Sequence, residues 1–212
     1  MVITIDGLGV NGKTTLAKRI SNYLGFKNFN TGAIYRCIAL EIMNNKLDIN
    51  DIENVISNVK DLQIDFDGNN VILNGIDVSK RIREEDISVN STAWATIPEI
   101  KVLVRKIQKD FIKKYDTVIE GRDIAVRIAP DADVKFYLYS DFETRVNRLA
   151  LEKQDIDINV IRKNLKVRDD LDINGGNFVK PNDAYEIDTS LKTIDEVYEE
   201  MIEIINKNLT KI

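Results

Sequence analysis

The fold is decided by residues 2–20, VITIDGLGVNGKTTLAKRI. The apolar run Val2–Asp6 predicts a short strand buried in a parallel sheet. The stretch Lys13–Leu24 places its apolar residues on one helical face, and Gly25 is a suitable stop. The bend between them, residues 7–14, matches the pattern G-x-x-x-x-G-K-S/T. A strand before this pattern and a helix after it predict a phosphate-binding loop.

The residue types of this loop suit a nucleoside triphosphate. Glycines let backbone N–H groups converge on phosphate oxygens, and the start of the helix adds positive partial charge. Lys13 is expected to reach the β- and γ-phosphates, and the hydroxyl of Thr14 to help hold Mg²⁺. The predicted triphosphate-binding residues are Gly7, Leu8, Gly9, Val10, Asn11, Gly12, Lys13, Thr14 and Thr15.

The composition excludes several other kinds of site. The 212 residues contain no histidine, so His-ligated metal sites and Ser-His nucleophiles are absent. Cys37 is the single cysteine, which excludes an internal disulfide and a cysteine zinc cluster. A net charge of −5 argues against a nucleic-acid partner. With no long apolar run and a strand starting at Val2, we expect a cytoplasmic protein with no membrane partner.

The order of the predicted elements indicates one α/β domain. Strands near residues 2, 26, 117, 134 and 185 alternate with helices, which predicts a doubly wound parallel sheet with helices on both faces. Residues about 62–97 differ, because Asn74-Gly75 lies between short apolar runs and predicts an antiparallel hairpin. We interpret this stretch as an inserted subdomain. Thr31 and Ser140 are expected to cap the helices that follow them.

Several arginines stand at the ends of predicted elements. Arg36 lies in the first turn of the second helix, and Arg122 directly follows a buried strand in EGRD, residues 120–123. In this fold, ligands bind outside the carboxyl ends of the strands, and arginine forks suit phosphate oxygens. The positions therefore favour transfer of a phosphoryl group. Arg145 and Arg148 lie three residues apart on one helix, and for either of them taken alone we favour a solvated helix face.

The chain resembles the bacterial cytidylate kinases, a family of nucleoside monophosphate kinases with a phosphate-binding loop. The stretches that carry the resemblance run in order through the sequence: ITIDGLGVNGKTTLAKRISNYLGF, NTGAIYR, EGRDIAVRIAPDADVKFYL and RDDLD. The resemblance implies transfer of the γ-phosphoryl group of ATP to CMP or dCMP with Mg²⁺. It also implies a monomer, an acceptor-binding insert, and a mobile lid over residues about 145–178.

The resemblance assigns further residues. The loop would hold ATP, and Lys13, Arg122 and Arg168 would be catalytic. The lid would contribute Arg145, Arg148 and Arg168. A carboxylate at Asp123 could accept hydrogen bonds from the cytosine amine, and Asp172 would meet the sugar hydroxyls. The residues implied to bind the acceptor are Arg36, Thr92, Lys101, Arg122, Asp123 and Asp172.

The chain also departs from the family pattern. Lys101 stands where the family usually has arginine, and Asn30 where it has aspartate. In the lid, Leu171 and Gly175 replace two arginines. Two alternatives therefore stay open: a kinase of the same fold for another small acceptor, or an ATP-binding protein without catalysis and with a degenerate lid.

Overall fold

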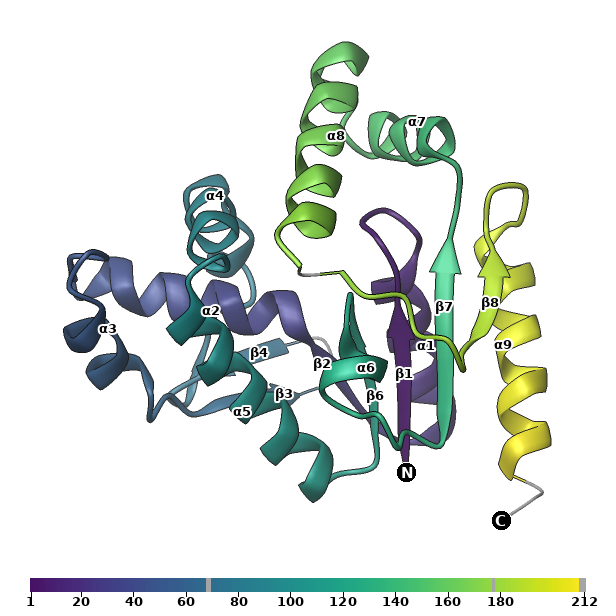
Figure 1. The fold of residues 1–212 in the computed structure, drawn as a ribbon, viewed down its shortest axis with the longest axis horizontal. Coiled ribbons are helices and arrows are strands. Elements are labelled where there is room, and N and C mark those ends of the chain that lie inside the picture. Colours follow the sequence, from purple (N-terminus) through teal and green to yellow (C-terminus); the bar gives the residue numbers. More distant parts are fainter. Residues whose placement is uncertain (68–69, 177, 210–212) are drawn as a thin grey trace. The chain divides into compact units, whose positions relative to one another are not determined.

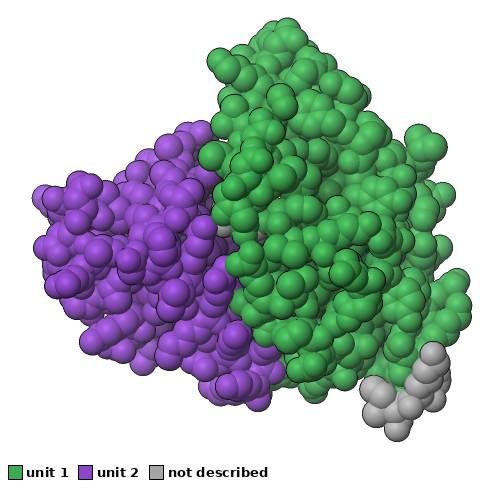
Figure 2. Space-filling view, viewed as in Figure 1, with its two compact units in different colours: residues 1–26, 115–212 green, residues 27–114 purple. Residues whose placement is uncertain are grey.

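The computed structural model describes residues 1–67, 70–176 and 178–209 of the chain (Figure 1). Residues 68–69 of the expected insert and residue 177 of the expected lid lie outside the described part. The chain divides into unit 1, residues 1–26 and 115–212, and unit 2, residues 27–114 (Figure 2). The helices and strands are numbered in chain order. They are β1 Val2–Asp6, α1 Lys13–Leu24, β2 Lys27–Asn30, α2 Thr31–Asn44, α3 Ile52–Val59, β3 Ile64–Asp67, β4 Asn70–Leu73, β5 Ile76–Asp77, the 3₁₀ helix η1 Arg81–Arg83, α4 Glu85–Trp94, α5 Pro98–Lys114, β6 Thr117–Gly121, α6 Ile124–Arg127, β7 Val134–Tyr139, α7 Phe142–Glu152, α8 Ile158–Asn174, β8 Tyr185–Asp188 and α9 Ile194–Leu209.

Unit 1 is built on parallel strands in the order β6-β1-β7-β8 (Figure 1). Strand β1 pairs with β6 so that Asp6 stands opposite Gly121. The residues that follow these two strands therefore leave the sheet at the same edge. Ligands of open parallel sheets bind at this edge, beyond the carboxyl ends of the strands.

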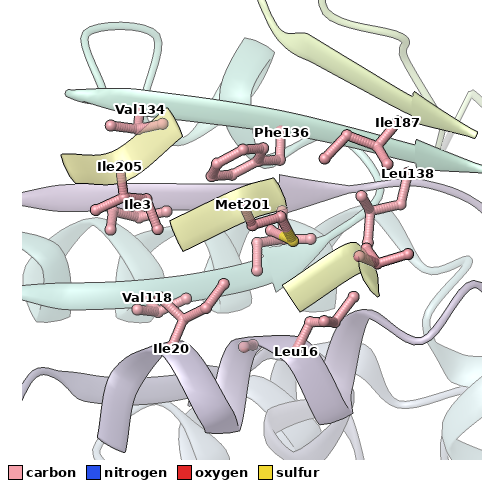
Figure 3. Close-up of a cluster of buried hydrophobic side chains, with 13 residues drawn as sticks. Ile3, Leu16, Ile20, Val118, Val134, Phe136, Leu138, Ile187, Met201 and Ile205 are labelled. Atoms are coloured by element: carbon pink, nitrogen blue, oxygen red, sulfur yellow. The ribbon is translucent and has the colours of Figure 1, made fainter. Parts of the chain in front are cut away.

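The core of unit 1 lies on one face of this sheet. Ile3 and Ile5 of β1 are fully buried under side chains from α1 and α9, among them Leu16 and Met201 (Figure 3). Because side chains alternate along a strand, Asp6 points to the opposite face, where it contacts α6. Helices thus cover both faces of the parallel sheet, and the predicted fold class is confirmed.

Unit 2 carries the antiparallel sheet β3-β4-β5 together with α2 to α5. Its hairpin turns at Asn74 and Gly75 with φ values of 50° and 82°. Two consecutive positive values are those of the type I′ turn that Asn-Gly favours, so the predicted hairpin is confirmed. The rings of Phe29, Phe66 and Phe111 pack together with centroids 4.6 to 6.1 Å apart and form part of the core.

Two of the predicted helix caps are wrong by one residue. The side chain of Asn30 accepts a hydrogen bond from the N–H of Ala33, so Asn30 caps α2 and Thr31 is its first helical residue. Similarly Asp141 caps α7, in place of Ser140. Asparagine is preferred over threonine at this position, which favours Asn30. The hydroxyl of Ser140 donates instead to the side chain of Asn11.

Candidate active site

The loop between β1 and α1 has the backbone conformation of a phosphate cradle. Gly7 has a φ of 149°, and a side chain there would collide with the carbonyl oxygen of Leu138. Gly12, with a φ of 78°, precedes the first turn of α1. Residues 10–15 line a hollow of about 120 Å³ at the start of this helix. Its free N–H groups and positive partial charge suit an anion.

Lys13 is buried at the base of this hollow. Its ammonium group donates a hydrogen bond to the carbonyl oxygen of Leu8, with Nζ and O 2.6 Å apart. The pKa of Lys13 is lowered to about 8, mainly by burial and also by the nearby charges of Arg122 and Arg168, while Glu120 opposes the shift. The loop itself, residues 7–14, has no acidic side chain. A phosphate bound there would therefore place a negative charge next to Lys13 and favour its charged form.

The side chain of Asn11 makes its hydrogen bonds within the protein. Its Nδ2 donates to the carbonyl oxygens of Leu8 and Leu138 at 3.3 and 3.2 Å, and its Oδ1 accepts from the hydroxyl of Ser140 at 2.5 Å. Asn11 is 3% exposed. It therefore braces the loop internally and ties it to the end of β7.

We expect Asn11→Ala to raise the KM for ATP about tenfold, because a loop that has lost its brace must be ordered when phosphate binds. The KM for the acceptor should stay unchanged. Steady-state kinetics with each substrate varied in turn measures both values. Asn22→Ala on the exposed face of α1 is the matched control. An unchanged KM for ATP in Asn11→Ala would contradict the role of the brace.

Thr14 is joined to Glu120, a residue that the sequence analysis did not select. The hydroxyl of Thr14 donates to Oε1 of Glu120 at 3.0 Å, and Glu120 is buried at the carboxyl end of β6. Among the described residues no cluster of three or more His, Cys, Asp or Glu side chains could hold a metal. One hydroxyl and one carboxylate nevertheless suit Mg²⁺, which prefers oxygen ligands and takes the rest from phosphate and water.

Beyond β6, the predicted residues Arg122 and Asp172 meet. Nε of Arg122 and Oδ2 of Asp172 are 2.5 Å apart, although their alignment is not that of a regular hydrogen bond. Burial raises the pKa of Asp172, and the charge of Arg122 lowers it part of the way back. The N–H of Val179 donates to the carbonyl oxygen of Arg122, so the segment after α8 is held beside the end of β6. A cation and a carboxylate thus stand together one strand away from the phosphate loop.

Asp6 fixes the start of α6 and with it the position of Asp123. Its carboxylate accepts hydrogen bonds from the N–H groups of Ile124 and Ala125 at 2.9 and 2.8 Å. The pKa of Asp6 is raised to about 6, because the effect of burial, with a smaller one from the charge of Asp123, exceeds the opposing effect of the two N–H donors. A single carboxylate therefore links the strand before the phosphate loop to the helix after Arg122.

The raised pKa of Asp6 predicts a pH dependence of stability. Between about pH 4 and 6 the carboxyl group of Asp6 keeps its proton in the folded protein but has lost it in the unfolded chain. Rising pH therefore lowers the free energy of unfolding across this window, by on the order of 3 kcal/mol. Urea unfolding should show this fall in the native protein and a flatter curve in Asp6→Asn. Asp131→Asn, at an exposed position, should follow the native curve. The same dependence of unfolding free energy on pH in all three proteins would contradict the raised pKa of Asp6.

The three arginines predicted for a lid lie in different surroundings. Arg145 is 4% exposed and forms two bonds to Asp169 of α8, so the solvated helix face expected as an alternative is wrong for it. Arg148 donates to the hydroxyl and the carbonyl oxygen of Thr189. Arg168 lies over the phosphate loop, since a Cβ added at Gly9 would be 3.6 Å from its Cζ.

A cavity of about 390 Å³ adjoins the phosphate loop. The loop and α1 form one wall, Arg148 of α7 contributes to another, and the segment from β8 into α9 closes it. Sequence reasoning missed this last segment because no motif marks it. The lining residues are Asn11, Gly12, Thr15, Leu16, Arg148, Thr189, Lys192, Thr193, Ile194 and Val197. A pocket of this size next to a phosphate cradle suits the rest of a nucleotide.

The remaining predicted residues belong to unit 2. Arg36 is half-buried on α2, and Lys101 is half-buried on α5. Thr92 is exposed on α4, and its hydroxyl donates to the carbonyl oxygen of Ser88. The structure therefore brings Lys13, Arg122, Asp172 and Arg168 together within unit 1. Arg36, Thr92 and Lys101 all belong to unit 2.

The sequence matches known proteins over nearly its whole length. The family model described as cytidylate kinase matches residues 3–207. A cytidylate kinase of Clostridium botulinum (strain Okra / Type B1) is 36% identical over 97% of this chain and 98% of its own length. A cytidylate kinase of Clostridioides difficile (strain 630) is 34% identical over 97% of this chain and 98% of its own length.

Solved structures agree on the fold. A shikimate kinase from Bacteroides thetaiotaomicron aligns with a TM-score of 0.50 at 10% identity, covering 97% of this chain and 98% of its own. An uncharacterized protein from Eubacterium ventriosum aligns with a TM-score of 0.55 at 13% identity, covering 98% of both chains. At such identities the likeness concerns the fold alone.

In the described part of the chain, no helix has the length and apolar character needed to cross a membrane.

Proposed function

The chain belongs to the cytidylate kinase family, and we propose that it transfers the γ-phosphoryl group of ATP to CMP or dCMP, giving ADP and CDP or dCDP. The observation that carries the proposal is the pairing of β1 with β6, which places Asp6 opposite Gly121. The phosphate loop follows β1, and Arg122 and Asp123 follow β6. A site for the donor phosphates and a site for an acceptor phosphate thus begin on neighbouring strands.

In this proposal the loop residues and Lys13 bind the phosphates of ATP, and the adjoining cavity receives its nucleoside. Thr14 and Glu120 fit a Mg²⁺ ion bound together with the ATP phosphates. Such an ion would neutralise charge on the transferring group. Lys13 and Arg168 are two cations of the protein beside the loop. Their role is to stabilise the negative charge that spreads over the γ-phosphoryl oxygens.

On the acceptor side, we assign the phosphate to Arg122, the cytosine amine to Asp123 and the sugar hydroxyls to Asp172. The Arg122–Asp172 contact supports this, since it places a cation that suits a phosphate and a carboxylate that suits hydroxyl groups side by side. The family resemblance adds Arg36, Thr92 and Lys101 as acceptor contacts. The acceptor is already an anionic phosphate, so the reaction needs positioning and charge neutralisation more than a general base.

We further propose that α7 and α8 form the lid, with Arg145, Arg148 and Arg168. Val146, Ile161 and Leu165 form a small core between these two helices, so the pair can act as one body. Closure of such a body over ATP would keep water from competing with CMP for the phosphoryl group.

The test is an acceptor screen. Purified protein is incubated with ATP and Mg²⁺ and with CMP, dCMP, UMP, AMP or GMP, and ADP formation is followed. Turnover that is fastest with CMP or dCMP is expected. Faster turnover with another acceptor would replace the cytidine assignment with a different kinase activity. ATP binding without turnover on any acceptor would contradict the enzyme assignment itself.

A further inference from the structure

Arg127, the last residue of α6, reaches from the proposed acceptor site to the end of α8. Its Nε lies 3.2 Å from Oδ2 of Asp123, and its Nη2 donates to the carbonyl oxygen of Gly176 at 3.0 Å. No sequence motif pointed to this residue. One guanidinium group therefore contacts both Asp123 and the turn that follows α8.

The two contacts of Arg127 belong to a larger junction. Asp172 lies in the last turns of α8, four residues before Gly176, and forms an ion pair with Arg122. The N–H of Val179 donates to the carbonyl oxygen of Arg122 at 3.2 Å. The turn after α8 is thus attached to the segment from β6 to α6 at several points. Asp123 and Asp172 each pair with an arginine of this junction, Asp123 with Arg127 and Asp172 with Arg122.

We propose that Arg127 is a positioning residue for recognition of the acceptor base, an inference that rests on the proposed function. Its planar guanidinium fixes the direction of the Asp123 carboxylate and at the same time holds the end of α8. Several donors in one rigid plane allow both contacts at once, which an ammonium group on a flexible stem cannot reproduce. Arg127 itself touches neither the phosphates nor the reacting atoms in this proposal.

The consequence concerns the choice between cytosine and uracil. A carboxylate accepts hydrogen bonds, and cytosine offers it an exocyclic amine, whereas uracil presents a carbonyl oxygen at that position. A site that hydrogen-bonds a polar group strongly rejects the analogue lacking that group, provided that its own partner is held in place. When Asp123 can rotate away, CMP loses the hydrogen bond from its amine to the carboxylate. UMP is then no longer repelled, because its carbonyl oxygen does not face the carboxylate. The preference for CMP should therefore fall.

A merely structural role is the main competing explanation. Exposed ion pairs within one helix contribute little to stability. Arg81 of unit 2 provides a control of equal exposure, because its side chain is 37% exposed, as that of Arg127 is, and it also contacts two groups, Glu84 and Asp86. Arg81→Met removes surface contacts to two acidic side chains at a position that the proposed site does not use.

The experiment compares the native protein with Arg127→Met, Arg127→Lys and Arg81→Met in steady-state kinetics with ATP, CMP and UMP. For Arg127→Met we expect a KM for CMP raised about tenfold and a CMP-over-UMP ratio of kcat/KM lowered about tenfold. The KM for ATP and the urea midpoint should be unchanged. Arg127→Lys should fall between Arg127→Met and the native protein, and Arg81→Met should match the native protein.

Two results would overturn the inference. One is a native CMP-over-UMP ratio in Arg127→Met. The other is an equal rise in the KM values for CMP and ATP together with a lowered urea midpoint, which would make the role structural. Failure of the proposed function is recognised separately, because the native protein would then show no preference for CMP or dCMP at all.

Discussion

Lys13→Ala is expected to lower kcat/KM for ATP about a thousandfold. Lys13 is buried under the phosphate loop, and the cations Arg122 and Arg168 lie close enough to lower its pKa. A charge placed in this way acts on the transferring phosphoryl group and gains strength from its dry surroundings. The measurement is initial-rate kinetics with ATP varied at saturating CMP.

The matched control is Lys18→Ala, which removes an exposed lysine from the same helix. Its kinetics should be those of the native protein. Burial already disfavours the ammonium group of Lys13, so Lys13→Ala should not unfold the chain, and urea unfolding checks this point. A fully folded Lys13→Ala with native turnover would show that residues 7–14 do not hold the donor.

The phosphate loop is the part of the site that the sequence predicted best. Its motif constrains the backbone, and the strand, the helix and the stop at Gly25, with a φ of 70°, all follow from local patterns. Asn11 shows where such prediction ends. Its membership of the loop was predictable, but the direction of its side chain depends on Leu138 and Ser140, which lie more than a hundred residues later in the sequence.

The helix caps show a second limit of sequence reasoning. Thr31 was expected to cap α2, yet Asn30 does so, because adjacent polar residues compete for one position and the strand before them decides between them. Asn30 was noted in the sequence as a departure from the family pattern. Its amide oxygen caps α2 as an aspartate carboxylate would, so the departure leaves this end of the helix satisfied.

Glu120 and Arg127 show a third limit. Both belong to the stretch around EGRD, yet their partners Thr14 and Gly176 come from distant parts of the sequence. A charged residue after a buried strand indicates a site, but it does not indicate which group the charge will meet. Only the register of β1 with β6 brings Thr14 and Glu120 together.

Arg145→Met is expected to lower the free energy of unfolding by about 3–5 kcal/mol. The side chains of Arg145 and Asp169 are 5% and 10% exposed, and two hydrogen bonds of 3.0 and 2.6 Å join them. Removing the arginine leaves the carboxylate of Asp169 buried without its cation. The same guanidinium donates to the carbonyl oxygen of Gly9, so the loss also frees the phosphate loop from α7. Urea unfolding measures the change.

A double-mutant cycle separates the cost of an orphaned charge from the value of the pair itself. Asp169→Leu alone should be about as destabilising as Arg145→Met, whereas the two together should recover much of the loss, because no buried charge remains. Arg162 offers a matched comparison, since it also joins α8 to α7 by a two-bonded contact with Glu143, but with side chains 38% and 57% exposed. Arg162→Met should cost at most about 1 kcal/mol, because solvent screens an exposed pair. Equal losses in Arg145→Met and Arg162→Met would mean that burial of the Arg145–Asp169 pair has no energetic consequence, and the pair would then hold α7 and α8 together no more firmly than its exposed counterpart.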